Sequence, residues 1–176
     1  MTKKLETVTN IAILIVAVLA GAVLVKNYLL PRAPRKMPEQ IPVGTKLSVP
    51  GVDWQANGNT LVLVLTTGCE YCSESAPFYR RLAAELPRQR VHMTAVLPQT
   101  VEEGREYLRK LEVDVSDVRQ SSLEVLKIHA TPTLVLADEQ GVVLNVWLGQ
   151  LSADKQQQVI ETVLGASELN KTIDRD

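Results

Sequence analysis

A run of aliphatic residues followed by a closely spaced pair of cysteines constrains the fold of this chain more than any other feature. Leu61-Val-Leu-Val-Leu65 contains no polar residue, which is typical of a β-strand buried on both faces. Strands of this kind occur in α/β sheets, where helices pack against the sheet. Cys69 and Cys72 follow the run, and a helical pattern follows them. The sequence therefore predicts that the cysteines lie where a buried strand leads into a helix.

The rest of the chain from about residue 41 alternates between strand patterns and helix patterns. In the helix after the cysteines, Phe78, Leu82 and Leu86 form one apolar stripe, Pro77 predicts a kink and Pro87 predicts the end. The order β-α-β-α-β-β-α predicts an α/β fold with a mixed central sheet and helices on both faces. Further strands are predicted at Val91–Leu97, Leu134–Leu136 and Val142–Leu148, and further helices at Val101–Leu111, at Ser122–Ile128 and after Ser152.

An apolar block near the N-terminus predicts a transmembrane helix. Val8 to Val25 is apolar at all but three of its eighteen positions. A helix of eighteen residues is about 27 Å long, close to the roughly 30 Å of a bilayer's hydrocarbon core, and Tyr28 to Leu30 extend it. We therefore expect one membrane anchor over residues 8–30. A cleaved signal peptide ending near Ala20 is the alternative, although the apolar run continues beyond that residue.

The predicted organisation has five parts. They are a short tail over 1–7, the anchor over 8–30, a linker rich in Pro and basic residues over 31–40, a domain over 41–166 and a polar tail over 167–176. Prolines favour an extended chain, so the linker would hold the domain a short way off a bilayer. Basic residues flank both ends of the anchor, and the charge count leaves its orientation open.

The charge and the cysteine count restrict the function. A net charge of -1 gives no broad basic face, so we do not expect nucleic acid as a partner. The chain has only two cysteines, and a bridge between Cys69 and Cys72 would close a very short loop. Such a bridge removes little entropy from the unfolded chain. Reversible thiol chemistry explains this spacing better than a structural disulfide does.

The predicted position of the cysteines suits disulfide exchange. A helix start stabilises negative charge, and the thiolate is the reactive form of cysteine. Cys69 would attack a partner's disulfide, and Cys72 would then attack Cys69 and release the reduced partner. Glu70 places a negative charge beside the thiolate and opposes its formation, which favours a reductant, although a merely solvated Glu70 is equally consistent. Tyr71 offers an aromatic surface for partner contact.

These residues resemble the thioredoxin superfamily, and in particular the membrane-anchored bacterial thiol–disulfide oxidoreductases of the TlpA kind. The resemblance covers about residues 43–164. It includes Cys69-x-x-Cys72 after a buried strand, Pro77 at the position of the helix-kinking proline, Thr131-Pro132 before a hairpin and a glycine turn at Gly149. The resemblance implies a thioredoxin-like fold in which Pro132 is cis and packs against the cysteines. It also implies that the Thr131 backbone binds an extended substrate segment.

The resemblance implies a function as well. Family members of this kind reduce disulfides of envelope proteins, such as components of cytochrome c maturation, with electrons from a membrane thiol carrier. We therefore expect the chain in the bacterial inner (cytoplasmic) membrane, as a single-pass protein whose domain faces the periplasm or the cell exterior. No cofactor and no metal are implied.

The sequence departs from the family at four positions near the cysteines, and one is Tyr71, where relatives often carry Pro. Gly68 stands where most relatives carry Trp before the first cysteine. Leu63 replaces the buried Asp of thioredoxins, and Ser75 replaces the Glu of some TlpA-like proteins. The group that accepts the proton during exchange is therefore unassigned.

Two other functions remain open from the residues. Thr66-x-x-Cys69 matches part of the peroxiredoxin motif, which would make the chain a thiol peroxidase, but Val62 replaces the expected proline. A copper chaperone would bind Cu(I) through Cys69, Cys72 and His129, because soft thiolates suit that ion. An exposed His129 without a ligand role is the simpler interpretation.

Overall fold

The computed structural model describes residues 13–21, 41–89 and 91–173. The chain divides into two units, Met1–Met37 and Pro38–Asp176. Residues 13–21 are helical, but most of the predicted transmembrane segment 8–30 and the whole linker 31–40 lie outside the described residues. Within the described ranges, no helix combines the length and the apolar character that a membrane span needs.

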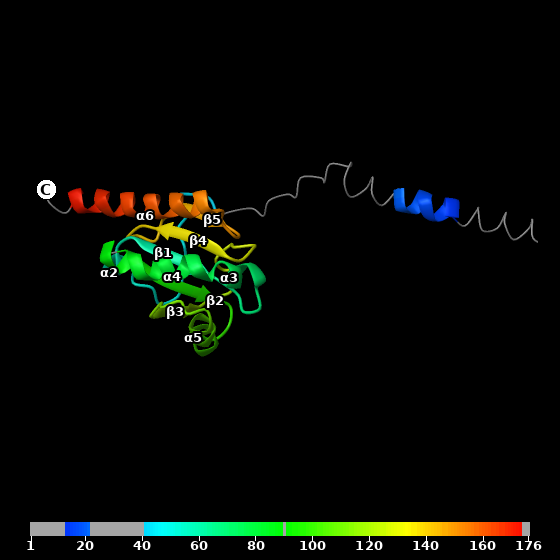
Figure 1. Cartoon of the computed structure of the whole chain (residues 1–176). Coiled ribbons are helices and arrows are strands. Elements are labelled where there is room, and N and C mark those ends of the chain that lie inside the picture. The colour runs from blue at the N-terminus through cyan, green and yellow to red at the C-terminus, as the bar shows by residue number, and fades with distance from the viewer. Residues whose placement is uncertain (1–12, 22–40, 90, 174–176) are drawn as a thin grey trace, which may run out of the picture. The chain divides into compact units, whose positions relative to one another are not determined.

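The second unit is built on one mixed sheet of five strands (Figure 1). Its order is β3-β2-β1-β4-β5. Strands β1, β2 and β3 are parallel to one another, and β4 runs antiparallel to both β1 and β5. The mixed sheet predicted from the sequence is thus confirmed. The bounds are β1 Thr60–Val64, β2 His92–Leu97, β3 Asp117–Gln120, β4 Thr133–Ala137 and β5 Val143–Leu148.

Side chains from strand β1 alternate between two apolar clusters, one on each face of the sheet. Every residue of this strand is buried, and Leu61 and Leu63 belong to one cluster while Val62 and Val64 belong to the other. This explains why the strand has no polar position. The first cluster includes side chains from three helices, α4 Ala76–Glu85, α5 Val101–Lys110 and α6 Ala153–Ile173. In Figure 1, α5 lies by β3 and α6 lies along the other edge of the sheet.

The helix after the cysteines is interrupted as Pro77 predicts. It consists of α3 Glu70–Glu74 and then α4, and Ser75 separates the two. Pro77 is the second residue of α4, a position where its missing N–H leaves no hydrogen bond unmade. Helix α4 leads into a 3-10 turn, η2 Leu86–Gln89, which contains Pro87.

The second face of the sheet carries less helix than the sequence predicts. Its cluster is covered by residues from 41–52, by Trp54 of the short helix α2 Trp54–Asn57 and by residues from 121–130. The helix predicted at Ser122–Ile128 is wrong, because this segment forms turns. Lys127 has a φ of 55°, in the left-handed region, and a right-handed helix cannot continue through it.

Strand β3 is absent from the order predicted from the sequence. Its residues are mostly polar, and it has one neighbour only, at the edge of the sheet. Asp117 anchors it, since its carboxylate accepts hydrogen bonds from the Thr94 hydroxyl at 2.8 Å and from Arg119 Nε at 2.6 Å. A short polar edge strand carries no apolar period, so its pairing depends on contacts with distant residues.

Candidate redox site

Both cysteines lie at the N-terminal end of α3, directly after strand β1. Cys69 is the N-cap residue of this helix, and its sulfur accepts a hydrogen bond from the Cys72 backbone N–H at 3.2 Å. The two cysteines form a disulfide, with their Cα atoms 5.2 Å apart. Cys72 is fully buried, whereas Cys69 is partly exposed. Only Cys69 is therefore accessible to another protein.

A tight turn brings the chain from the strand to the helix. The Cys69 N–H donates to the Thr66 carbonyl at 3.3 Å, and Gly68 inside the turn has a φ of 77°. This conformation is strained for every residue with a Cβ atom. The departure from the family's Trp thus has a local reason, because a glycine suits this backbone.

The loop before β4 completes the site from a distant part of the sequence. The Thr131–Pro132 peptide is cis, as the family resemblance implies, and Pro132 is buried. The Thr131 carbonyl oxygen lies 3.6 Å from the Cys69 sulfur. The Gly149 N–H donates to the Pro132 carbonyl at 2.7 Å, so the glycine turn after β5 holds this loop. The structure therefore brings Cys69, Cys72, Thr131 and Pro132 together.

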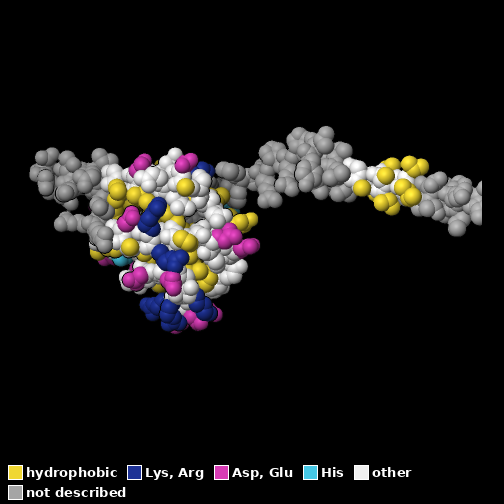
Figure 2. All heavy atoms as spheres, in the orientation of Figure 1, with side chains coloured by type: hydrophobic (Ala, Val, Ile, Leu, Met, Phe, Trp, Pro, Cys, Tyr) yellow, Lys and Arg dark blue, Asp and Glu magenta, His cyan; other side chains and the backbone are white. Residues whose placement is uncertain are grey.

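The two residues between the cysteines point to solvent. Glu70 is exposed, and the Tyr71 side chain is 56% exposed. Figure 2 shows acidic side chains on the surface at the end of the domain where Figure 1 places α3. Their roles in tuning the exchange and in partner contact stay predictions.

The two positions that hold acids in relatives carry no proton acceptor here. Leu63 is fully buried in the apolar cluster beneath the helices. Ser75 is buried too, and its hydroxyl donates to the Tyr71 carbonyl at 2.7 Å. This hydroxyl stabilises the end of α3. Neither side chain can therefore remove a proton from Cys72.

Helix α5 contacts α3, which sequence reasoning missed. The Ser73 hydroxyl of α3 lies 3.3 Å from the Tyr107 hydroxyl of α5. No local pattern signals such a pair, because the two residues are 34 positions apart and both side chains are common on helix surfaces. The contact fixes the outer side of α3 against a helix that packs on β2 and β3.

The structure gives no support to a copper site. Of the residues described, no three His, Cys, Asp or Glu side chains are grouped so that they could hold a metal ion. His129 is exposed. Cys69, Cys72 and His129, the ligands of the copper hypothesis, therefore do not form such a group in the structure.

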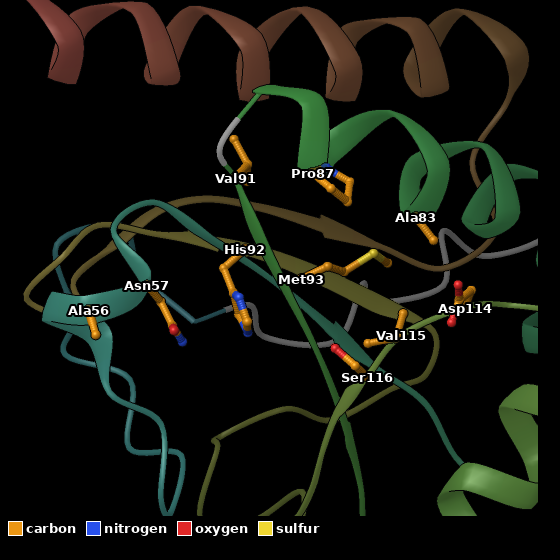
Figure 3. Close-up of a pocket in the computed structure, with 10 residues that line it drawn as sticks. All are labelled: Ala56, Asn57, Ala83, Pro87, Val91, His92, Met93, Asp114, Val115 and Ser116. Atoms are coloured by element: carbon orange, nitrogen blue, oxygen red, sulfur yellow. The ribbon is translucent and has the colours of Figure 1, made fainter.

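A cavity of about 360 Å³ lies at the opposite end of the sheet from the cysteines. Val91 and His92 line it at the start of β2, whereas Cys69 follows the end of the parallel strand β1. Figure 3 shows Asn57 and His92 toward one side of this cavity and Asp114 toward the other. Neither cysteine lines it, so this cavity is separate from the candidate redox site.

Comparison with solved structures identifies the fold. A Chlorobium tepidum protein assigned as thiol:disulfide interchange protein DsbE matches with a TM-score of 0.58 and 17% identity, over 73% of this chain and 99% of its own. The thioredoxin domain of a Bacteroides vulgatus thiol–disulfide oxidoreductase matches with a TM-score of 0.56 and 14% identity, over 71% and 99%. A thiol:disulfide interchange protein from Bacteroides sp. has a TM-score of 0.56 and 17% identity, over 71% and 91%.

These likenesses confirm the thioredoxin-like fold that the sequence predicts. No protein-family model matches the chain, and no curated protein matches it in sequence.

Proposed function

We propose that this thioredoxin-fold chain is a thiol–disulfide oxidoreductase that exchanges disulfides with other proteins through Cys69 and Cys72. The observation that carries the proposal is the disulfide at the start of α3, with one sulfur accessible and the other buried. The cis-proline loop beside it supports the same function, because its Thr131 carbonyl lies next to Cys69. An extended partner segment could pair with this backbone.

The exchange proceeds in two displacements. The Cys69 thiolate attacks a sulfur of the partner's disulfide, the partner's S–S bond breaks, and its second sulfur leaves as a thiolate. Cys72 then attacks the Cys69 sulfur, and its proton ends on the partner thiolate that was released in the first displacement. The Cys69–Cys72 bond forms, the partner's first sulfur leaves, and the partner has gained two electrons.

The direction that we propose is reduction of the partner. Two features oppose a thiolate on Cys69, namely the charge of the neighbouring Glu70 and the partly negative Thr131 carbonyl oxygen 3.6 Å from the sulfur. A less stable thiolate makes the reduced form a stronger electron donor. The hydrogen bond from the Cys72 N–H stabilises the thiolate instead. A measured reduction potential shows which of these opposing effects is larger.

We also propose that residues 8–30 anchor the chain in the bacterial inner membrane, with the domain facing the periplasm or the cell exterior. The apolar sequence of this segment supports the anchor. Partners would then be envelope proteins with disulfides. The electrons would come from a thiol carrier in the same membrane.

Single cysteine variants test the function. Cys69→Ser should abolish the acceleration that the protein gives to the reduction of insulin disulfides by dithiothreitol, because the accessible cysteine nucleophile is gone. Cys72→Ser should retain the first displacement and accumulate mixed disulfides with insulin, visible by mass spectrometry and cleaved by excess reductant.

Ser122→Ala is a matched control, since this serine is exposed and lies outside α3 and the cis-proline loop. It should react as the wild type does. If Cys69→Ser still accelerated insulin reduction, or if Cys72→Ser trapped nothing, the exchange mechanism would be wrong.

A further inference from the structure

One buried hydroxyl close to the cysteines has no hydrogen-bond partner. Of the buried side-chain oxygens and nitrogens in the described part of the chain, only Thr66 Oγ1 is unpaired. A buried polar group without a partner is destabilising. Such an atom near a reactive group calls for a function that requires it.

Thr66 belongs to the turn that presents Cys69. Its carbonyl accepts the Cys69 N–H at 3.3 Å, so the two residues close one turn. The next residue is also held, because the Thr67 N–H donates to the Gln99 side chain at 3.4 Å. The backbone on both sides of the unpaired hydroxyl is thus hydrogen-bonded.

Hydrogen-bond donors around the Cys69 sulfur stabilise the two redox states to different extents. In the disulfide the sulfur is uncharged and a weak acceptor. In the reduced protein the sulfur becomes a thiolate. Hydrogen bonds to a charged acceptor are stronger than those to a neutral one, so a donor stabilises the thiolate more than the disulfide. The Cys72 N–H is one donor at 3.2 Å, whereas the Thr131 carbonyl at 3.6 Å offers only an oxygen. Among the residues that the structure describes, no second N–H or O–H donates to this sulfur.

We propose that the Thr66 hydroxyl supplies this second donor, and that it hydrogen bonds to the Cys69 thiolate once the disulfide is reduced. The hydroxyl is unpaired in the disulfide form because it serves the reduced form. Thr66 would then offset the Thr131 carbonyl and set the reduction potential. The inference rests on the proposed function and adds a residue to its mechanism.

The reaction that reveals this role is equilibrium with glutathione. Two glutathione thiols each give one electron and form glutathione disulfide, and the Cys69–Cys72 bond breaks. Cys69 keeps the negative charge, Cys72 takes one proton, and the second proton goes to solvent. A donor that stabilises only the thiolate shifts this equilibrium toward the reduced protein.

Thr66→Val keeps the side-chain shape and removes the donor. We expect the ratio of reduced to oxidised protein at a fixed glutathione poise to fall about tenfold, which is about 30 mV for a two-electron couple. Thr66→Ser keeps a hydroxyl and should restore the wild-type ratio. Thr67→Val is the matched control in the same turn and should leave the ratio unchanged.

A second measurement does not depend on exchange. In a Cys72→Ala background only Cys69 remains to titrate as a thiol, and the ultraviolet absorbance of its thiolate can be followed against pH. Thr66→Val should move this titration to higher pH, and Thr66→Ser should not. If the valine variant does not fold, Thr66→Ala replaces it in both measurements.

The outcomes separate the two claims. Failure of the wild type to equilibrate with glutathione would refute the proposed function. If the wild type equilibrates, an unchanged ratio and an unchanged titration in Thr66→Val overturn the role of Thr66. A hydroxyl with only a structural role would alter thermal stability equally in both redox states and would move neither readout.

Discussion

At the scale of single residues, the two sulfurs of the site differ in their exposure to solvent. Cys69 precedes the first turn of α3 and is partly exposed, while Cys72 follows three residues later and is fully buried. Attack on a partner needs an accessible thiolate, whereas the second displacement is intramolecular. In the exchange that we propose, the unequal exposure assigns the first displacement to Cys69.

A buried phenol near this site gives a pH prediction at the residue scale. Burial raises the pKa of Tyr79 to about 12 from 10.0, and a hydrogen bond with the Ser75 side chain partly opposes the rise. Folding favours the protonated phenol, so its contribution is complete below pH 10 and is lost between pH 10 and 12. Between pH 10 and 12 the free energy of unfolding of the wild type should therefore fall by roughly 2–3 kcal/mol more than that of Tyr79→Phe.

Urea denaturation at a series of alkaline pH values measures this difference. Tyr71→Phe is the control, because the Tyr71 ring is exposed, and this variant should follow the wild type. Parallel pH dependences for Tyr79→Phe and the wild type would show that the buried phenol is not the titrating group.

At the scale of elements, side chains at the helix ends explain where helices begin. The Thr100 hydroxyl accepts the Glu103 N–H, and the Glu103 carboxylate accepts the Thr100 N–H at 3.0 Å, which is a complete capping box for α5. These bonds with Thr100 hold the pKa of Glu103 below its ordinary value. The start of α3 differs, because its N-cap is Cys69, whose sulfur accepts the Cys72 N–H.

Removal of the α5 cap should destabilise the domain. Thr100→Ala leaves the Glu103 N–H without its partner, and we expect a loss of about 1 kcal/mol in the free energy of unfolding. Urea denaturation measures it. Glu103→Gln is the control, since a glutamine can still accept the Thr100 N–H, and it should lose less than Thr100→Ala.

Close packing of α5 on the sheet gives a second prediction at this scale. A Cβ atom on Gly104 would lie 3.1 Å from Val118 Cγ1 and 3.2 Å from Leu97 Cδ1. The further methyl groups of valine would clash, so we expect Gly104→Val to destabilise the domain by about 1–3 kcal/mol.

The same substitution at Gly165 is a matched control. Gly165 is also helical, and a Cβ atom there would meet nothing within 4 Å. Gly165→Val should leave the thermal unfolding midpoint unchanged or slightly higher, because valine favours a helix more than glycine does. Equal losses at both positions would show that the close contacts of Gly104 with Val118 and Leu97 are not the cause of the destabilisation.

At the scale of the whole molecule, the sheet order brings the site together. Strand β1 lies between β2 and β4, so its end meets both the start of α3 and the loop before β4. The Cys69–Thr131 contact joins residues 62 positions apart. A protein that must hold such a contact needs the complete sheet, and we expect the site to be lost when the sheet unfolds.

The division of the chain at Pro38 leads to a prediction for the second unit. A fragment of residues 38–176 contains the whole sheet and both cysteines. We expect it to unfold in one cooperative transition by circular dichroism and to reduce insulin as fast as the full chain. A fragment that fails to fold would show that residues before Pro38 are part of the core.

Membrane attachment is tested with the same two proteins. The full chain should remain with bacterial membranes after extraction at alkaline pH, because residues 8–30 are predicted to span them. The fragment of residues 38–176 should be released. Release of both proteins would refute the proposed anchor.

The sequence by itself determined the central strand, the cysteines after it, the break at Pro77 and the hairpin of β4 and β5. These features follow from local rules: a continuous aliphatic run, a proline without an N–H, and apolar strands joined by a short loop. The family resemblance added the cis peptide at Thr131–Pro132, which local rules alone do not predict.

Only the tertiary structure decided the edge strand β3, the turns at Ser122–Ile128 and the contact between Ser73 and Tyr107. Strand β3 depends on Thr94 and the α3 contact depends on Tyr107, both far away in the sequence. The turns place Leu126 and Ile128 in the apolar cluster on the second face of the sheet. The unequal burial of Cys69 and Cys72 and the unpaired Thr66 hydroxyl also belong to this group. Burial and hydrogen bonding at one residue are set by what other segments pack against it, which no local pattern encodes.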